Sequence, residues 1–133
     1  MIKKATFSIA IADNHQLIRQ TFIQVLTSFG YHVIIEAENG QPLIEKLEDG
    51  ELPDICVIDL DMPVLDGYET TEYIKQNWPS IKVLIFSLDN NIHNQQKALD
   101  CGADAFISKL EGIELLRQEL ERLKNDYKSS PFH

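Results

Sequence analysis

The chain lacks long apolar runs, has few cysteines and is short of positive charge. No stretch approaches the ~18 apolar residues of a membrane-spanning helix. Lysine and arginine together number 12 against 21 acidic residues, which leaves a net charge of −9. We therefore expect no contact with a membrane. We also expect no nucleic-acid binding by these residues themselves, because such binding depends on clustered positive charge.

Only two cysteines are present, Cys56 and Cys101, and they lack the spacing of a metal site. Both lie in apolar or helical segments, so we expect two buried free thiols in a reducing compartment. The start of the chain also fits a short signal peptide that is cleaved after Ala10-Ile11-Ala12. We favour a β-strand there, which cleavage would remove, and expect a cytoplasmic protein.

Short apolar runs alternate with segments in which apolar residues recur every three or four positions. The runs predict five strands, at residues 7–12, 33–37, 55–58, 83–86 and 105–107. The periodic segments predict five helices, at residues 18–29, 42–47, 67–78, 91–101 and 113–123. Asn14 is expected to cap the first helix, and Gly30 is expected to end it.

This alternation predicts an α/β fold with a five-stranded parallel sheet and helices on both faces. Right-handed crossovers leave few topologies, and we expect the strand order 2-1-3-4-5, which rests in part on the family resemblance described below. In such a sheet the winding direction reverses between the first and third strands, and ligands bind there at the carboxyl ends of the strands. The length of 133 residues fits one domain. We expect it to span residues 1–128, with residues 129–133 as a linker or disordered tail.

Polar side chains stand at the predicted carboxyl ends of four strands. Asp13 follows the first strand and Asp59 the third, and these strands are neighbours at the point of reversal. Ser87 ends the fourth strand and Lys109 follows the fifth. Two carboxylates this close repel each other unless a cation binds, and their oxygens suit Mg²⁺. A carboxylate beside Mg²⁺, a lysine and a hydroxyl can accept a phosphoryl group.

Four segments in this order resemble a known family: IADN, VIDLDMPVLDG, FSLD and GADAFISK. They resemble the receiver domain of two-component response regulators, and the resemblance extends from about Phe7 to Leu123. It implies a phosphoprotein of phosphorelay signal transduction and transcription regulation, rather than an enzyme with turnover. It also implies that Pro63 and Gly67 shape the loop after the third strand.

The resemblance implies a role for each polar residue. Asp59 would be the phosphoacceptor, Ser87 would bond a phosphoryl oxygen, and Lys109 would pair with the phosphoryl group. Phe106 occupies the position of an aromatic residue that rotates inward on activation. Ser87 and Phe106 are therefore the predicted switch residues.

The resemblance also implies a Mg²⁺ site made of Asp13, Asn14, Asp59 and the backbone carbonyl of Asp61. The family usually carries an acid at the position of Asn14. An amide oxygen brings no charge, so we expect weaker Mg²⁺ binding, which the carboxylate of Asp61 could offset. Leu88 departs from the family as well, because a small residue is usual there, and it could narrow access to Asp59.

The implied partners follow from the family. A histidine kinase or phosphotransfer protein would donate the phosphoryl group, and a homodimer could form through the fourth helix, the fifth strand and the fifth helix. The opening IADNHQLIR resembles regulators in which a LuxR-type helix-turn-helix follows the receiver. Nucleic acid would then be bound by a C-terminal domain outside these residues.

Two other interpretations stay open. A receiver-like module could be regulated by protein contacts alone, which Asn14 and Leu88 favour. The sequence Asp59-Leu60-Asp61 after an apolar strand also fits the nucleophile motif of haloacid-dehalogenase-type phosphatases. Residues 110–116, however, lack the acidic metal-binding motif that this family needs downstream.

The fourth predicted helix has few apolar residues, and Ile92, Ala98 and Leu99 are expected to anchor it. Few buried contacts predict low local stability, so we expect this helix to respond to phosphorylation. No function is assigned to three histidines: His15, His32 and His93.

Overall fold

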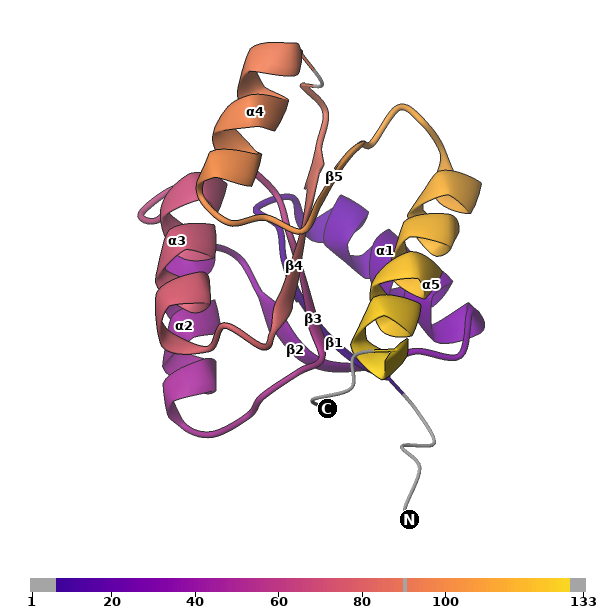
Figure 1. The fold of residues 1–133 in the computed structure, drawn as a ribbon, viewed down its shortest axis with the longest axis horizontal. Coiled ribbons are helices and arrows are strands. Elements are labelled where there is room, and N and C mark those ends of the chain that lie inside the picture. The colour runs from indigo at the N-terminus through magenta and orange to yellow at the C-terminus, as the bar shows by residue number, and fades with distance from the viewer. Residues whose placement is uncertain (1–6, 90, 130–133) are drawn as a thin grey trace.

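The structure, a computed structural model, describes residues 7–89 and 91–129, with side chains described as far as residue 126. Strands and helices alternate along the chain (Figure 1). The strands are β1 (Ser8–Ala12), β2 (His32–Ala37), β3 (Ile55–Ile58), β4 (Lys82–Ser87) and β5 (Ala105–Ser108). The helices are α1 (Gln16–Ser28), α2 (Gly40–Glu48), α3 (Gly67–Asn77), α4 (Ile92–Asp100) and α5 (Ile113–Ser129). Residues 130–133 of the expected tail lie outside the described residues.

All the strands pair in parallel in one sheet, in the order β2-β1-β3-β4-β5. Helices α1 and α5 cover one face, and α2, α3 and α4 cover the other (Figure 1). The predicted fold class and strand order are confirmed. Because β1 lies between β2 and β3, cleavage after Ala12 would remove an interior strand of the sheet.

Short polar side chains cap three helices by accepting a backbone N–H of the first turn. These caps are Asn39 at α2, Asp66 at α3 and Asn91 at α4. The predicted cap of α1 is wrong, because the N-cap residue is His15 and its side chain forms no capping bond. Asp13 Oδ1 instead accepts the His15 N–H at 2.9 Å, and Asn14 lies before the helix. Gly30, with a φ of 93°, follows the end of α1 as predicted.

The core has two halves, one on each face of the sheet. Residues along each strand alternate between the faces, so β1, β3 and β4 contribute to both halves. The helices add mainly leucine: Leu43, Leu47 and Ile74 on one face, and Leu26, Leu116, Leu120 and Leu123 on the other. Cys56 is buried on β3, but Cys101 is only partly buried, so the expectation of two buried thiols is wrong for Cys101.

Helix α4 is anchored by fewer side chains than its sequence indicates. Of the three expected anchors, only Ala98 is buried. Ile92 is 82% exposed and Leu99 is 48% exposed, so the prediction is wrong for these two. At its start, the side chain of Asn91 accepts the Asn94 N–H at 2.8 Å. The helix therefore rests on the sheet with little buried apolar surface.

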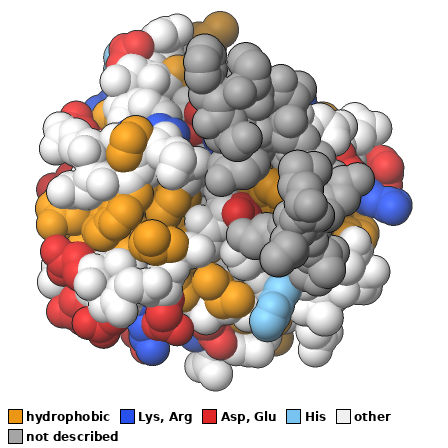
Figure 2. All heavy atoms as spheres, turned by 60° about the horizontal axis from the view of Figure 1, so that its bottom comes forward, with side chains coloured by type: hydrophobic (Ala, Val, Ile, Leu, Met, Phe, Trp, Pro, Cys, Tyr) orange, Lys and Arg blue, Asp and Glu red, His pale blue; other side chains and the backbone are white. Residues whose placement is uncertain are grey.

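The surface shows no concentration of positive charge on the face drawn in Figure 2. Acidic and apolar side chains share this face, and lysine and arginine side chains are scattered among them. Within the described part of the chain, no helix is both long enough and apolar enough to cross a membrane.

Candidate functional site

The carboxyl ends of β1 and β3 bring Asp13 and Asp59 together. The N–H of Asp59 donates to the carbonyl of Ala12 at 3.0 Å, so the two acids lie at adjacent strand ends. Asp13 is 3% exposed and Asp59 is 5% exposed. Two neighbouring carboxylates are thus buried, which costs free energy unless positive charge lies beside them.

Lys109 supplies part of that charge. Its Nζ lies 2.8 Å from Asp13 Oδ2 and 3.4 Å from Asp59 Oδ1, and its side chain is almost fully buried. The N–H of Lys109 donates to the carbonyl of Ser87 at 2.7 Å, which ties the segment after β5 to the end of β4. One lysine beside two carboxylates still leaves one negative charge uncompensated when all three groups are ionised.

The second oxygen of Asp59, Oδ2, is buried and has no hydrogen-bond partner among the described residues. Burial raises the pKa of Asp59 to about 6; Lys109 lowers this pKa and Asp13 raises it further. Buried polar atoms are nearly always hydrogen-bonded, since the loss of water is otherwise not offset. The lack of a partner at Asp59 Oδ2 therefore indicates that this oxygen binds a ligand or carries a covalent group.

Helix α1 holds Asp13 in place through Arg19. This arginine is 8% exposed, and its Nη1 donates to the carbonyl of Asp13 at 2.7 Å. Its Nε donates to Oε2 of Glu36 on β2 at 2.8 Å. One guanidinium therefore joins α1, β1 and β2. Sequence reasoning missed Arg19, although an arginine in the first turn of a helix that follows a site acid is a usable signal.

His15 also joins the site, and sequence reasoning missed this residue too. Its Nδ1 lies 3.4 Å from Asp13 Oδ1. Ligand atoms of Asp13, His15 and Asp59, one from each residue, lie within 4.8 Å of one another. The spacing in the sequence could have indicated this role. A histidine that lies two residues after a strand-end acid and just before a helix remains at the same edge of the sheet as that acid.

The predicted switch residues, Ser87 and Phe106, lie on the neighbouring strands β4 and β5. Ser87 is fully buried, and its Oγ accepts the N–H of Asp89 at 3.2 Å. Phe106 is partly buried and packs against the half of the core that includes Ala98 of α4. Ser87 thus bonds to the segment just before α4, and Phe106 packs against the core cluster to which α4 contributes Ala98.

Three other predicted residues are exposed: Asn14, Asp61 and Leu88. The Asp61 carboxylate contributes to the raised pKa of Asp59, although less than burial and Asp13 do. Leu88 is 51% exposed on the segment between β4 and α4. The roles of these residues at the metal site and at its entrance stay predictions.

The loop between β3 and α3 is tightly constrained. A Cβ atom at Gly67 would lie 2.6 Å from the carbonyl oxygen of Asp59, so only glycine fits there. Val64 has a φ of 67°, and the Leu65 N–H donates to the carbonyl of Pro63 at 2.7 Å, which makes a γ-turn. A β-branched residue is strained in this conformation. The loop after Asp59 is therefore fixed at its end and strained in its middle.

The donor set fits a hard divalent cation. Asp13 and Asp59 offer carboxylate oxygens, which Mg²⁺ prefers. The uncompensated negative charge and the unpartnered Oδ2 of Asp59 both favour an added cation. Asn14 and the backbone carbonyl of Asp61 stay the further predicted ligands.

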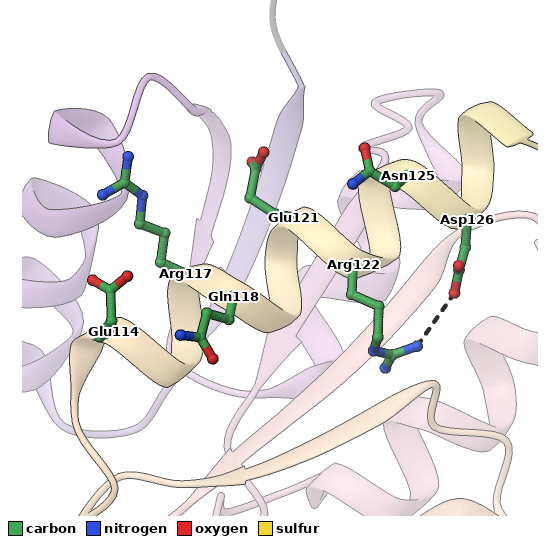
Figure 3. Close-up of a pocket in the computed structure, with 7 residues that line it drawn as sticks. All are labelled: Glu114, Arg117, Gln118, Glu121, Arg122, Asn125 and Asp126. Atoms are coloured by element: carbon green, nitrogen blue, oxygen red, sulfur yellow. Dashed lines mark hydrogen bonds and ion pairs between the residues drawn. The ribbon is translucent and has the colours of Figure 1, made fainter.

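An open hollow on the surface lies along α5 (Figure 3). All of its lining residues belong to α5: Glu114, Arg117, Gln118, Glu121, Arg122, Asn125 and Asp126. Arg122 pairs with Asp126 at 3.2 Å and with Glu119 at 3.0 Å, and the Arg117 guanidinium lies over the ring of Phe29. Because these arginines already have partners and the hollow shares no residue with the acidic group, we assign it no ligand.

A family model described as the response regulator receiver domain matches residues 9–121. The matched segment includes the four polar residues predicted at the strand ends, which are Asp13, Asp59, Ser87 and Lys109. It also includes every strand except the first residue of β1.

Curated relatives cover nearly all of this chain. It is 29% identical over 122 residues to the DNA-binding transcriptional activator EvgA of Escherichia coli (strain K12), covering 92% of this chain and 59% of EvgA. It is 34% identical over 121 residues to response regulator RR06 of Streptococcus pneumoniae serotype 2, covering 90% of this chain and 54% of that protein. The chain thus spans a little over half the length of these relatives.

Solved structures share the fold. A CheY-like response regulator receiver domain protein from Methanospirillum hungatei gives a TM-score of 0.82 at 26% identity, covering 95% of this chain and 100% of that chain. A DNA-binding response regulator of the LuxR family from Staphylococcus aureus gives 0.81 at 24% identity, covering 88% and 98%. With the family match over residues 9–121, these findings show that the chain belongs to the response regulator receiver domain family.

Proposed function

We propose that this receiver accepts a phosphoryl group on Asp59 from a phosphohistidine of a histidine kinase or phosphotransfer protein. The observation that carries the proposal is the buried Oδ2 of Asp59, which has no partner among the described residues. With a pKa of about 6, Asp59 is mainly ionised at neutral pH. An ionised carboxylate with an unpartnered oxygen can act as the nucleophile.

In the transfer, a bond forms between Asp59 Oδ2 and phosphorus while the bond from phosphorus to the donor's imidazole nitrogen breaks. The ammonium of Lys109, 3.4 Å from Asp59 Oδ1, is close enough to pair with a phosphoryl oxygen. The Ser87 hydroxyl accepts the Asp89 N–H, so it can donate its own hydrogen to another phosphoryl oxygen. Lysine and serine would thus share the charge that arrives with the group.

Mg²⁺ held by Asp13 and Asp59 would neutralise negative charge on the transferring group. Asn14 and the backbone carbonyl of Asp61 would complete its ligands, and the missing charge at Asn14 would weaken the binding. The Arg19 guanidinium and the His15 N–H both contact Asp13, so they fix its orientation before any cation arrives.

Phosphorylation would act on α4 through Ser87. When the Ser87 hydroxyl turns to the phosphoryl group, its bond to the N–H of Asp89 changes, and Asp89 lies just before α4. Phe106 packs against the cluster that includes Ala98, and it would rotate inward as this segment shifts. The result is a change in the populations of two states of the same fold.

Exposed apolar side chains supply surfaces for partners. Large ones lie on α1 and on the segments after β3, β4 and β5: Leu17, Val64, Leu88 and Leu110. These segments follow the carboxyl ends of the strands, so a phosphodonor that reaches Asp59 would cover them. The exposed Ile92, Leu99 and Ile113 on α4 and α5 suit the homodimer through α4, β5 and α5.

We propose transcription control as the output, through a domain outside these residues. EvgA is described as a DNA-binding transcriptional activator, and this chain covers 59% of it. The net charge of −9 disfavours nucleic-acid binding by these residues themselves. The free cysteines, Cys56 and Cys101, fit a reducing cytoplasmic location.

Two departures from the family favour a second function, in which protein contacts regulate the domain without phosphorylation. Asn14 brings no charge where the family usually has an acid, and Leu88 is larger than usual. The unpartnered Asp59 Oδ2 argues against it. A haloacid-dehalogenase-type phosphatase is disfavoured further, because the chain belongs to the receiver family.

Intact-mass spectrometry tests the phosphoacceptor. Incubation with Mg²⁺ and acetyl phosphate should add a single phosphoryl group, and Asp59→Asn should abolish the gain. Asp61→Asn is the matched control: it also removes a carboxylate but keeps the backbone carbonyl, so it should still be labelled. No gain at high Mg²⁺, or equal labelling of Asp59→Asn, would contradict the assignment. Steady hydrolysis of a phosphomonoester would indicate the phosphatase instead.

A further inference from the structure

In each carboxylate of the site, one oxygen is paired with Lys109. Lys109 takes Oδ2 of Asp13 and approaches Oδ1 of Asp59. The other two oxygens are Oδ1 of Asp13, which accepts the His15 N–H at 2.9 Å and lies beside the His15 imidazole, and the buried Oδ2 of Asp59, which has no partner among the described residues. A carboxylate oxygen has two lone pairs, so Oδ1 of Asp13 can still bind a cation. A cation bound to these two oxygens would therefore not need to displace the lysine.

His15 lies close enough to these carboxylates to be a third ligand of the same cation. Its Nδ1 lies 3.4 Å from Asp13 Oδ1, and its side chain is 53% exposed, so an ion can reach it from solvent. A neutral imidazole nitrogen with a lone pair and a carboxylate oxygen repel each other unless a proton or a cation lies between them. Ligand atoms bind a metal such as Zn²⁺ at about 2.0–2.2 Å. Atoms of Asp13, His15 and Asp59 within 4.8 Å of one another need only small side-chain movements to do so.

The chemistry of the third ligand decides which ion the site prefers. Mg²⁺ prefers oxygen ligands and keeps several waters. Imidazole suits Zn²⁺ and the neighbouring transition ions, which also accept carboxylates. Adding a histidine to two carboxylates should therefore strengthen the binding of Zn²⁺ and leave that of Mg²⁺ nearly unchanged.

We propose that His15, Asp13 and Asp59 form a mixed nitrogen–oxygen site for a transition ion of the Zn²⁺ type, with His15 as the residue that sets this preference. The inference rests on the proposed function in that the same two carboxylates serve both, but it does not require phosphorylation. It assigns a role to a histidine that the phosphoryl-transfer chemistry does not use.

Isothermal titration with Zn²⁺ and with Mg²⁺, without any phosphodonor, tests the proposal. His15→Ala should lower the affinity for Zn²⁺ by at least about tenfold, since even the loss of a partner behind a ligand costs about 10–100-fold. The same change should leave the affinity for Mg²⁺ unaltered. Asp59→Asn should weaken the binding of both ions. His93→Ala removes another exposed histidine, from α4, and should change neither.

A second readout follows the imidazoles directly. In a proton–carbon NMR titration, the ring signals of His15 should move with the first additions of Zn²⁺, before those of His93. The side chain of His15 does not cap α1, so His15→Ala is expected to fold normally, and its thermal unfolding checks this. Unchanged Zn²⁺ affinity in His15→Ala, or an equal loss in His93→Ala, would overturn the proposal. Failure of acetyl phosphate to label Asp59 would overturn the proposed function and leave the Zn²⁺ result intact.

Discussion

Helices α1 and α4 follow β1 and β4, whose carboxyl ends contribute to the candidate site, but the two helices are attached in different ways. On α1, Leu26 is fully buried, and the nearly buried Arg19 bonds to the backbone of Asp13. On α4, Ala98 is the buried residue among those described, and Ile92 and Leu99 are largely exposed. One border of the site is therefore fixed and the other is loosely held.

Under the proposed function, this difference would let one site both hold its ligands and signal. The fixed border keeps Asp13 beside Asp59 whether or not a phosphoryl group is present. Helix α4 buries little apolar area, so a small change at Ser87 can shift the populations of its conformations. Rigid positioning and easy switching are thus assigned to different helices.

The largest expected contrast is in stability. Leu26→Ala should lower the free energy of unfolding by about 2–5 kcal/mol, because it leaves a cavity in the core. Ile92→Ala, on the exposed side of α4, should change it by less than about 0.5 kcal/mol. Urea denaturation of both variants measures the difference. Equal losses would mean that α4 is anchored as firmly as α1.

Much of this arrangement was predictable from the sequence, because apolar periodicity predicts parallel strands that end at Asp13, Asp59, Ser87 and Lys109. The strand order came in part from the resemblance to the receiver family. The attachment of α4 was predicted only in part. Sequence shows that Ile92 and Leu99 are apolar, but which side of a short helix meets the sheet depends on how the helix is placed. The roles of Arg19 and His15 were missed, since they arise from contacts between elements rather than from a pattern within one.

A second comparison is between Asp59 and an asparagine at the same position. Without metal, Asp59→Asn should raise the free energy of unfolding at neutral pH by about 1–3 kcal/mol, since each pKa unit corresponds to about 1.4 kcal/mol. Burial raises the pKa of Asp59 from 3.8 to about 6, so the folded chain keeps a proton that the unfolded chain has already released. Wild-type stability therefore falls as the pH rises through this range.

The gain in the free energy of unfolding that Asp59→Asn brings should therefore vanish below pH 3.8, the ordinary pKa of an aspartic acid side chain, and be complete above pH of about 6, the pKa of Asp59 in the folded chain. Urea denaturation at a series of pH values in the presence of EDTA measures this. An advantage that does not depend on pH would show that the charge of Asp59 is not the cause.

The smallest expected effect lies in the loop between β3 and α3. Val64→Asn should stabilise the fold by about 1 kcal/mol, because asparagine tolerates a positive φ better than the β-branched valine does. The reference is Val33→Asn on β2, where the backbone is extended and no such gain is expected. Thermal unfolding compares the two variants, and a loss of stability in Val64→Asn would mean that the exposed valine makes a contact worth more than the strain.

The central claim is that a phosphoryl group on Asp59 shifts α4 while α1 stays fixed. Hydrogen exchange followed by mass spectrometry, with and without acetyl phosphate and Mg²⁺, tests it most directly. Before phosphorylation, amides of α4 should exchange faster than those of α1. After it, exchange should change in α4 and around Phe106, and remain as it was in α1. Exchange that changes equally in both helices, or in neither while the mass shows a bound phosphoryl group, would contradict the account.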